Sequence, residues 1–295
     1  MHIRRLEPPD QPALEKFLLP QLATSMFLLA NSRQVGFVDH GQRLQGTYIA
    51  VFDDHDEMLG VIAHYWNKNI ITQAPPALLP QLLKLLLKHS DRPIHGLIGP
   101  QAQVAALLAA IPQPHPPRQL DEPEFLYELN LNQLQIPDNL VNGRFHGRRA
   151  TPADQDILTL WRRDYHIEAL GAADSPALRA LCHNQIKTQI AAGTIWLLLD
   201  GGIPVSMTGF NATTTEAVQV GGVWTPTAYR SRGYARAAVA ASLRDAQAEG
   251  AYLAILFTGE TNYPAQKAYQ ALGFRHTADY HLLTFTEPIT TLPPH

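Results

Sequence analysis

Hydrophobic and polar positions in the second half of the chain predict strands and helices in alternation. Apolar residues three and four positions apart predict helices, whereas short apolar runs bounded by turn residues predict strands. The expected helices are 152–165, 176–191, an alanine-rich segment that ends at Glu249, and 262–272, and the expected strands are 146–149, 195–199, 205–211, 217–224, 252–257 and 281–285. Strand 252–257 (YLAILF) is apolar throughout, as strands covered on both faces are. The pattern predicts an α/β (α+β) domain with a central mixed sheet flanked by helices.

The first half of the chain shows the same order more faintly. Helices are expected near 11–17, 21–31, 78–88 and 103–110, with strands around 48–52 and 60–66. Two short sequences also recur. The pattern H-x-R-R-x-x-P-x-D starts at His2 and again at His146, and a strand–turn–strand sequence opening with Gly-Thr starts at Gly46 and again at Gly193. Two matches in the same order at nearly equal offsets predict duplicated domains.

The chain of 295 residues is long enough for two domains of ordinary size. A stretch that mixes Asn, Pro and Gly separates its two patterned halves, as linkers do. We place the first domain at 1–131, the linker at 132–143, the second domain at 144–288 and a frayed tail at 289–295.

Composition narrows the classes of function. Hydrophobic residues make up 45% and charged residues 17% of the chain, which describes a globular protein. The net charge of −3 provides no general attraction for nucleic acid, so we expect no nucleic-acid partner. Cys182 is the only cysteine, which excludes an intrachain disulfide, and the thirteen histidines show no metal-binding spacing, so we expect no metal.

Targeting signals are not apparent in the sequence. The start, MHIRRLEPPD, has no apolar core of the kind that signal peptides carry, and the longest apolar runs are shorter than the roughly 20 residues of a membrane span. We therefore expect a cytoplasmic protein, with no membrane partner, that is a monomer or a homodimer.

The segment TPTAYRSRGYARAAVAA, from Thr225, carries the first sign of chemistry. Three arginines surround one glycine where a strand ends and a helix begins, although the start of a helix already carries partial positive charge. Unpaired N–H groups at such a start bind anions, and a glycine lets the ligand approach the backbone closely. The segment therefore favours a phosphate-binding turn, and the alternative is a helix start with solvated arginines. A single glycine satisfies neither the dinucleotide-binding fingerprint nor the P-loop.

A second motif follows about thirty residues later. NYPAQKAYQALGF contains Asn262, Ala265, Tyr269, Gly273 and Phe274 in the pattern N-x-x-A-x-x-x-Y-x-x-x-G-F. Together with GGVWTPTAYRSRGYA, it closely resembles the signatures of the GNAT superfamily of acyl-CoA-dependent N-acyltransferases. The resemblance covers about 145–285, and the faint repeat implies that 1–131 is a diverged second copy. It implies two GNAT-like domains, each with a splayed fourth strand.

The resemblance also implies roles for individual residues. Val223 and Thr225 would present backbone groups to the pantetheine arm of acetyl-CoA or another short acyl-CoA, and an N–H near Val223 or Trp224 would face the oxyanion. The pyrophosphate would lie on the turn and helix start formed by Arg230, Ser231, Arg232, Gly233, Tyr234, Ala235 and Arg236. Asn262 and Ala265 would lie beside the pantetheine arm.

The implied reaction is direct attack of a primary amine on the thioester, through a tetrahedral intermediate. Tyr269 matches the family's general acid, although its helical spacing with Ala265 and Leu272 also fits an ordinary core position. An amine with a lysine-like pKa of about 10.4 must lose a proton first. Glu216 is the candidate base, with a solvent-exposed turn residue as the alternative. Tyr165, His166 and Glu168 are candidates for binding the acceptor.

The first half lacks both motifs. Where the second half has its arginine turn, the first has NIITQAPPALLPQLLKLLL, whose prolines offer no N–H donors. We therefore expect a catalytically silent first domain. For the whole chain the alternative to an enzyme is an acyl-CoA-sensing protein without activity, and the identity of the acceptor amine stays open.

Overall fold

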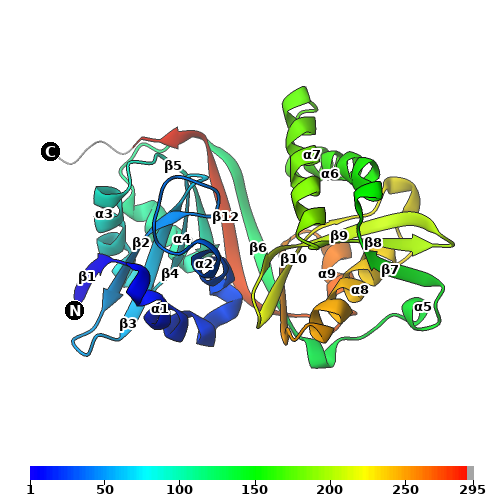
Figure 1. The fold of residues 1–295 in the computed structure, drawn as a ribbon. Coiled ribbons are helices and arrows are strands. Elements are labelled where there is room, and N and C mark those ends of the chain that lie inside the picture. The colour runs from blue at the N-terminus through cyan, green and yellow to red at the C-terminus, as the bar shows by residue number, and fades with distance from the viewer. Residues whose placement is uncertain (291–295) are drawn as a thin grey trace. The chain divides into compact units, whose positions relative to one another are not determined.

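The structure, a computed structural model, describes residues 1–290 and divides into two compact units (Figure 1). The first unit comprises 1–126 together with the C-terminal segment from Thr277, and the second unit comprises 127–276. Each unit is a mixed α/β structure in which helices cover a sheet.

The first unit contains eleven principal elements. Their order is β1 (His2–Arg5), α1 (Gln11–Leu18), α2 (Leu22–Val35), β2 (Gly46–Phe52), β3 (Met58–Tyr65), β4 (Asn69–Gln73), α3 (Leu79–His89), β5 (Ile94–Pro100), α4 (Gln101–Ala110) and β6 (Arg118–Asn130), with β12 (Arg275–Ile289) added from the end of the chain. Short 3-10 turns precede α1, α2 and α3. Within residues 1–290, only Pro8–Val35 is long and apolar enough to cross a membrane, and it is half-buried and divided into α1 and α2.

The second unit repeats this order. It contains α5 (Asp138–Val141), β7 (Phe145–Arg149), α6 (Gln155–Leu170), α7 (Pro176–Ala191), β8 (Ile195–Asp200), β9 (Ile203–Thr213), β10 (Ala217–Trp224), α8 (Tyr234–Ala248), β11 (Leu253–Gly259) and α9 (Tyr263–Gln270). From β7 onward, each helix and strand has a counterpart at the same place in the first unit. The repeated order predicted from the sequence is therefore confirmed.

The repeated H-x-R-R-x-x-P-x-D sequence forms the same side-chain pair in both units. Arg4 donates to both carboxylate oxygens of Asp10 at 2.6 and 2.7 Å, and Arg148 donates to both oxygens of Asp154 at 2.7 and 2.8 Å. Each aspartate also accepts the backbone N–H of the residue three positions before it, which starts a 3-10 turn. The pair ties the first strand of each unit to the following helix.

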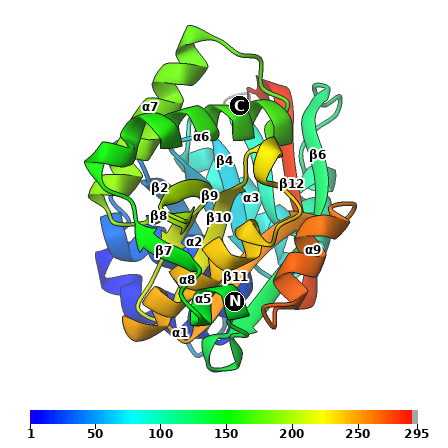
Figure 2. The ribbon, with the colours of Figure 1, turned by 90° about the vertical axis from the view of Figure 1, so that its right-hand side faces the viewer.

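The sheet of the second unit has the strand order β7-β8-β9-β10-β11, with the end of β6 beside β11. β10 is antiparallel to β9 and parallel to β11. Helices α6 and α7 lie on one face and α8 lies on the other (Figures 1 and 2). The first unit has the corresponding parallel pair, β4 beside β5.

Alternation of side chains along the strands separates the two faces of the second unit. Leu197 packs with residues of α6 and α7 in one apolar cluster, whereas Trp196, its neighbour, points toward α8 and donates its indole N–H to Asp245 at 2.8 Å. The small residues of α8 allow close approach to the sheet. A Cβ atom added to Gly147 would overlap the side chain of Ala241.

The compact units differ from the domain boundaries predicted from the sequence. Strand β12, which contains the predicted strand 281–285, does not complete the second unit, because it pairs antiparallel with β5 of the first, Leu282 opposite Ile98. The predicted linker 132–143 lies in the second unit and contains α5. The predicted tail begins inside β12, which extends to Ile289, and from 291 onward it lies outside the described residues.

Candidate functional site

The centre of the candidate site is the C-terminal end of β10. Its register with β9 shifts between Gly221 and Trp224, and Gly222 has a φ of +60°, so the strand carries a bulge there. Pairing with β11 ends at Val220, opposite Leu256. The edge of β10 that faced β11 is therefore open from Gly221 onward, which is the splay expected of the fourth strand.

Thr225 anchors the chain as it leaves β10. Its hydroxyl lies 2.9 Å from that of Ser206 on β9, and Ser206 donates to the carbonyl of Trp224 at 3.0 Å. These bonds position the backbone of both residues at the end of the strand. The predicted contact residues Val223, Trp224 and Thr225 thus lie on the bulge or directly after it.

The turn before α8 exposes a row of backbone donors. Ser231 and Gly233 have φ values of +62° and +78°, and no side chain caps the helix that follows. Within residues 1–290, the N–H groups from Arg232 to Arg236 donate no hydrogen bond. Successive N–H groups in a turn of this kind form an anion-binding concavity, and the helix dipole adds to it.

The arginines of the turn divide into two groups. Arg236 lies over the glycine, since its Nη2 is 3.8 Å from where a Cβ atom on Gly233 would be, and its buried Nε has no hydrogen-bond partner among the described residues. Arg232 is exposed, and its guanidinium interacts with the hydroxyl of Tyr234, which donates to Asp200. The open N–H groups and Arg236 fit a diphosphate.

Arg230 points elsewhere. Its Nε donates to the carbonyl of Thr225 at 3.0 Å, its guanidinium lies 4.8 Å from the ring centre of Trp224, and it forms a 2.6 Å ion pair with Glu168 of α6. The sequence interpretation grouped Arg230 with the phosphate-binding residues. The structure instead connects it to a residue that was predicted to bind the acceptor.

The residues predicted to bind the acceptor lie on α6, near the bulge of β10. The Tyr165 ring contacts the Trp224 ring edge-to-face, with centroids 6.3 Å apart. His166 is half-buried beside Gln185, and burial together with the nearby Arg162 guanidinium lowers its pKa below the ordinary value of 6.5. Tyr165 and Glu168 are therefore brought to the end of β10, and His166 follows Tyr165 on the same helix.

Helix α9 carries the second motif. The Asn262 side chain accepts the N–H of Ala265 at 3.3 Å and so starts the helix. Tyr269 is half-buried, and burial together with the phenol of Tyr165 raises its pKa well above the ordinary value of 10. The electrostatic effect of Tyr165 indicates that the two predicted site residues are near one another.

Glu216 is placed away from the rest of the site. It immediately precedes β10, and its carbonyl accepts the N–H groups of Tyr252 and Leu253 where the parallel pairing with β11 begins. Val223 lies seven positions after it along the strand, which is roughly 20 Å in extended backbone. The backbone of Glu216 thus lies at the start of β10 and the bulge lies near its end, and the role of Glu216 as the base stays a prediction.

Two residues of this region were not predicted from the sequence. Arg162 of α6 is buried against Gly222, and a Cβ atom on that glycine would overlap its guanidinium. The pair Gly221-Gly222 inside an otherwise apolar strand was the available signal, since glycine there often marks a bulge or a close approach. Nothing in the sequence around Arg162 distinguishes it from a solvated helix arginine.

Comparison with known protein families assigns this region. Residues 155–274, which fall entirely inside the second unit, match the family model described as the acetyltransferase (GNAT) family. The second unit is a GNAT-family domain. A comparison with curated proteins found no match.

Solved structures resemble the chain beyond the GNAT domain, all at low identity. A Drosophila protein aligns over 99% of this chain and 98% of its own, with 12% identity and a TM-score of 0.65. A GCN5-related N-acetyltransferase from Kribbella flavida covers 90% and 95%, with 18% identity and a TM-score of 0.57. A tandem GNAT protein from the clavulanic acid biosynthesis pathway covers 96% and 97%, with 14% identity and a TM-score of 0.54. They confirm the predicted fold class of two GNAT-like units.

The first unit departs from the GNAT domain at the corresponding turn. Strand β4 leads through Pro75 and Pro76 into α3, and the N–H of Ala74 is bound by the side chain of Gln103 at 3.1 Å. No row of open donors precedes α3 comparable to that before α8. Before α3, the prolines have no N–H groups and the N–H of Ala74 is already hydrogen-bonded, whereas the corresponding N–H groups before α8 are open.

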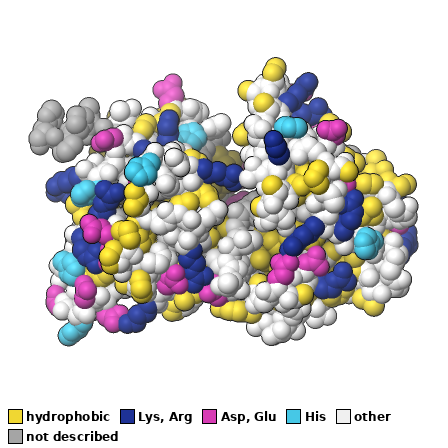
Figure 3. All heavy atoms as spheres, in the orientation of Figure 1, with side chains coloured by type: hydrophobic (Ala, Val, Ile, Leu, Met, Phe, Trp, Pro, Cys, Tyr) yellow, Lys and Arg dark blue, Asp and Glu magenta, His cyan; other side chains and the backbone are white. Residues whose placement is uncertain are grey.

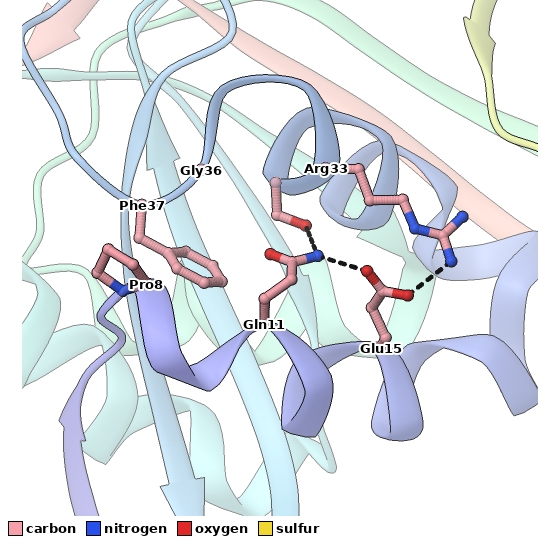
Figure 4. Close-up of a pocket in the computed structure, with 7 residues that line it drawn as sticks. Pro8, Gln11, Glu15, Arg33, Gly36 and Phe37 are labelled. Carbon is pink, nitrogen blue, oxygen red and sulfur yellow. Dashed lines mark hydrogen bonds and ion pairs between the residues drawn. The ribbon is translucent and has the colours of Figure 1, made fainter.

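A hollow of about 260 Å³ elsewhere in the first unit is lined by polar side chains (Figure 4). Its polar side chains bind one another: Gln11 donates to Glu15 at 2.8 Å, and Arg33 donates to Glu15 at 2.7 Å. No group of three or more His, Cys, Asp or Glu side chains suited to a metal ion occurs within residues 1–290.

Proposed function

We propose that the second unit transfers an acetyl or other short acyl group from coenzyme A to a primary amine, by direct attack of the amine through a tetrahedral intermediate, in the cytoplasm. One observation carries the proposal. The open N–H groups from Arg232 to Arg236, with the unpartnered Nε of Arg236 above them, follow directly on the bulged and splayed end of β10.

Different residues would bind the diphosphate, the pantetheine arm and the thioester of acetyl-CoA. The turn and Arg236 would hold the diphosphate through charge-assisted hydrogen bonds. The open edge of β10 at Val223 and Thr225 would pair with the amides of the pantetheine arm, with Asn262 and Ala265 on its other side. The bound thioester supplies an activated carbonyl carbon, and a backbone N–H at Val223 or Trp224 would stabilise negative charge on its oxygen.

Tyr269 would act on the leaving sulfur. A raised pKa keeps its phenol protonated at neutral pH, so it is available as a donor. The thiol that leaves has a reference pKa of about 8.5, and it departs readily once a donor stabilises its charge. The first unit would not catalyse, because its β4–α3 turn lacks the donors.

Small-molecule substrates fit the charge distribution better than nucleic acid does. On the face drawn in Figure 3, Lys and Arg side chains are interspersed with Asp and Glu and form no single basic patch. The net charge of −3 likewise provides no general attraction for nucleic acid, so a local anion best explains the arginines at the start of α8.

The test separates an enzyme from a binding protein. Calorimetry would measure acetyl-CoA binding, and a thiol-detecting reagent would follow release of coenzyme A with a panel of primary amines. We expect micromolar binding and amine-dependent thiol release. Binding without release for any amine would instead favour the acyl-CoA-sensing alternative, and no binding would overturn both.

A further inference from the structure

Arg162 is a buried cation with few partners. Its side chain lies on α6 and is 6% exposed. Nη2 donates to Gln189 at 2.9 Å, whereas Nε is fully buried without a partner among the described residues. Nη1 also donates to no atom of residues 1–290, and unlike Nε it is not fully enclosed. One hydrogen bond therefore serves the five N–H donors of this guanidinium.

Among residues 1–290, no carboxylate forms an ion pair with Arg162. Burial lowers its pKa, and the groups that oppose this effect are the phenol of Tyr165 and the thiol of Cys182, neither of which is a carboxylate. Burying an uncompensated ion costs several kcal/mol, which proteins ordinarily offset with an opposite charge. Two neighbouring arginines that are more exposed than Arg162 do have carboxylate partners, since Arg163 pairs with Asp164 and Arg230 pairs with Glu168.

The position of Arg162 connects it to the chemistry. Its guanidinium lies against Gly222, the residue with positive φ in the β10 bulge, and 5.7 Å from the ring centre of Tyr165. Tyr165 in turn contacts Trp224, whose indole Nε1 is also buried without a partner among the described residues. Two donors that lack an acceptor therefore flank Tyr165 at the end of the strand where acyl transfer is proposed.

We propose that the acceptor is a small amine that also carries a carboxylate, and that Arg162 binds this carboxylate through Nη1. The inference rests on the proposed acyl transfer and names its substrate class. A carboxylate accepts a charge-assisted hydrogen bond from a guanidinium N–H, which is stronger than a bond to a neutral acceptor, and it also supplies the opposite charge that Arg162 lacks. A polyamine or an aminoglycoside would bring further positive charge toward a buried cation, and like charges in such a site repel.

The test compares acceptors that differ only in the carboxylate. Thiol release from acetyl-CoA would be measured with the twenty amino acids, β-alanine and 4-aminobutyrate, and with the carboxamide and the decarboxylated amine of each active compound. We expect kcat/KM for the best carboxylate to exceed that of its amide and amine by about 100-fold or more, because a site built for a polar group rejects analogues that leave it unpaired.

Variants identify the group responsible. In Arg162→Met the ratio between acid and amide should fall toward one, and in Arg162→Lys it should be only partly retained. The matched control is Arg163→Met, on the same helix, whose guanidinium pairs with Asp164; it should keep the ratio. Unchanged acetyl-CoA affinity and thermal unfolding would show that Arg162→Met is folded.

The outcomes distinguish this inference from the proposed function. Turnover of amides and amines as fast as acids would overturn the inference and leave the acyltransferase in place. If no compound releases thiol, the proposed function fails, and binding of the N-acetylated amino acids in the presence of coenzyme A then decides the inference. If the N-acetylated amino acids raise the thermal unfolding temperature of the wild type but not of Arg162→Met, a carboxylate site is supported. If they raise it in neither protein, the inference is overturned.

Discussion

The Arg230 guanidinium lies 2.6 Å from the Glu168 carboxylate, so the turn that precedes α8 is tied to the end of α6. The sequence analysis predicted that Arg230 binds the pyrophosphate and that Glu168 binds the acceptor, and the structure joins these two residues in one ion pair. Arg230 also covers the ring of Trp224 at 4.8 Å. Under the proposed function, Arg230 would therefore shape the acceptor side of the site rather than hold the diphosphate.

Exchange of Arg230 and of Arg236 should therefore have different effects. We expect Arg236→Gln to weaken acetyl-CoA binding by about 10-fold to 100-fold, because charged hydrogen bonds contribute about 1.5–3 kcal/mol. Arg230→Gln should change the dissociation constant by less than about threefold and should raise KM for the amine. Calorimetry and steady-state kinetics measure the two effects. Equal losses of acetyl-CoA affinity would show that Arg230 turns to the diphosphate on binding.

Tyr269→Phe should lower kcat by about 100-fold or more and leave acetyl-CoA affinity unchanged, because the hydroxyl would act only as charge develops on sulfur. Since the pKa of Tyr269 is raised well above 10, its titration should not shape the rate below about pH 9. Wild type and variant should therefore share one pH profile between pH 6 and 9. A kcat within threefold of wild type would instead assign Tyr269 to the core.

Asp154 should contribute stability that acid removes. Hydrogen bonds from Arg148 lower its pKa from 3.8 to about 2. A depressed pKa stabilises the folded state above pH 3.8, and this contribution is lost as the pH falls through 2. Asp154→Asn should cost about 2 kcal/mol at pH 7 and progressively less below pH 3.8. Denaturant unfolding across this range measures the difference.

The repeat supplies the matched comparison for that variant. Asp10 makes the same pair with Arg4 in the first unit, and its pKa is also lowered. Asp10→Asn should destabilise the protein in the same direction, and the double variant should show the sum of both losses, since the two sites share no partner. A strongly non-additive result would mean that the two pairs do not act independently.

Glu124, on β6, should lower the free energy of unfolding at alkaline pH. Burial and the neighbouring Glu122 raise its pKa from 4.5 to about 7. Below pH 4.5 the carboxyl is protonated in both the folded and the unfolded state, so it does not change the free energy of unfolding. Between pH 4.5 and 7 only the unfolded state ionises, so the free energy of unfolding falls as the pH rises. Glu124→Gln should therefore raise the unfolding free energy by about 1–2 kcal/mol at pH 8, after allowance for partial exposure, and leave it unchanged at pH 4. A gain of equal size at both pH values would exclude ionisation as the cause.

Local patterns predicted most elements of the second unit. Strand 217–224 and helix 176–191 have the predicted bounds, because apolar periodicity, a capping Ser175 and flanking turns all act within a few residues. The same reasoning missed β1, β4, β5 and β6 of the first unit, and the last two show why. β5 (IHGLIGP) is interrupted by glycines, and β6 (RQLDEPEFLYELN) is largely polar, so neither shows a strand pattern.

By itself, the sequence determined the duplication, the arginine and glycine turn before α8 and the α9 motif, since each depends on residues close together in the chain. Only the tertiary structure decided that β12 joins the first unit, that Glu216 lies at the far end of β10, and that Arg162 is buried without a counter-charge beside Gly222. These facts depend on strand pairing and on the packing of a helix against a bulge. Residue type and spacing do not encode which distant groups share a low-dielectric environment.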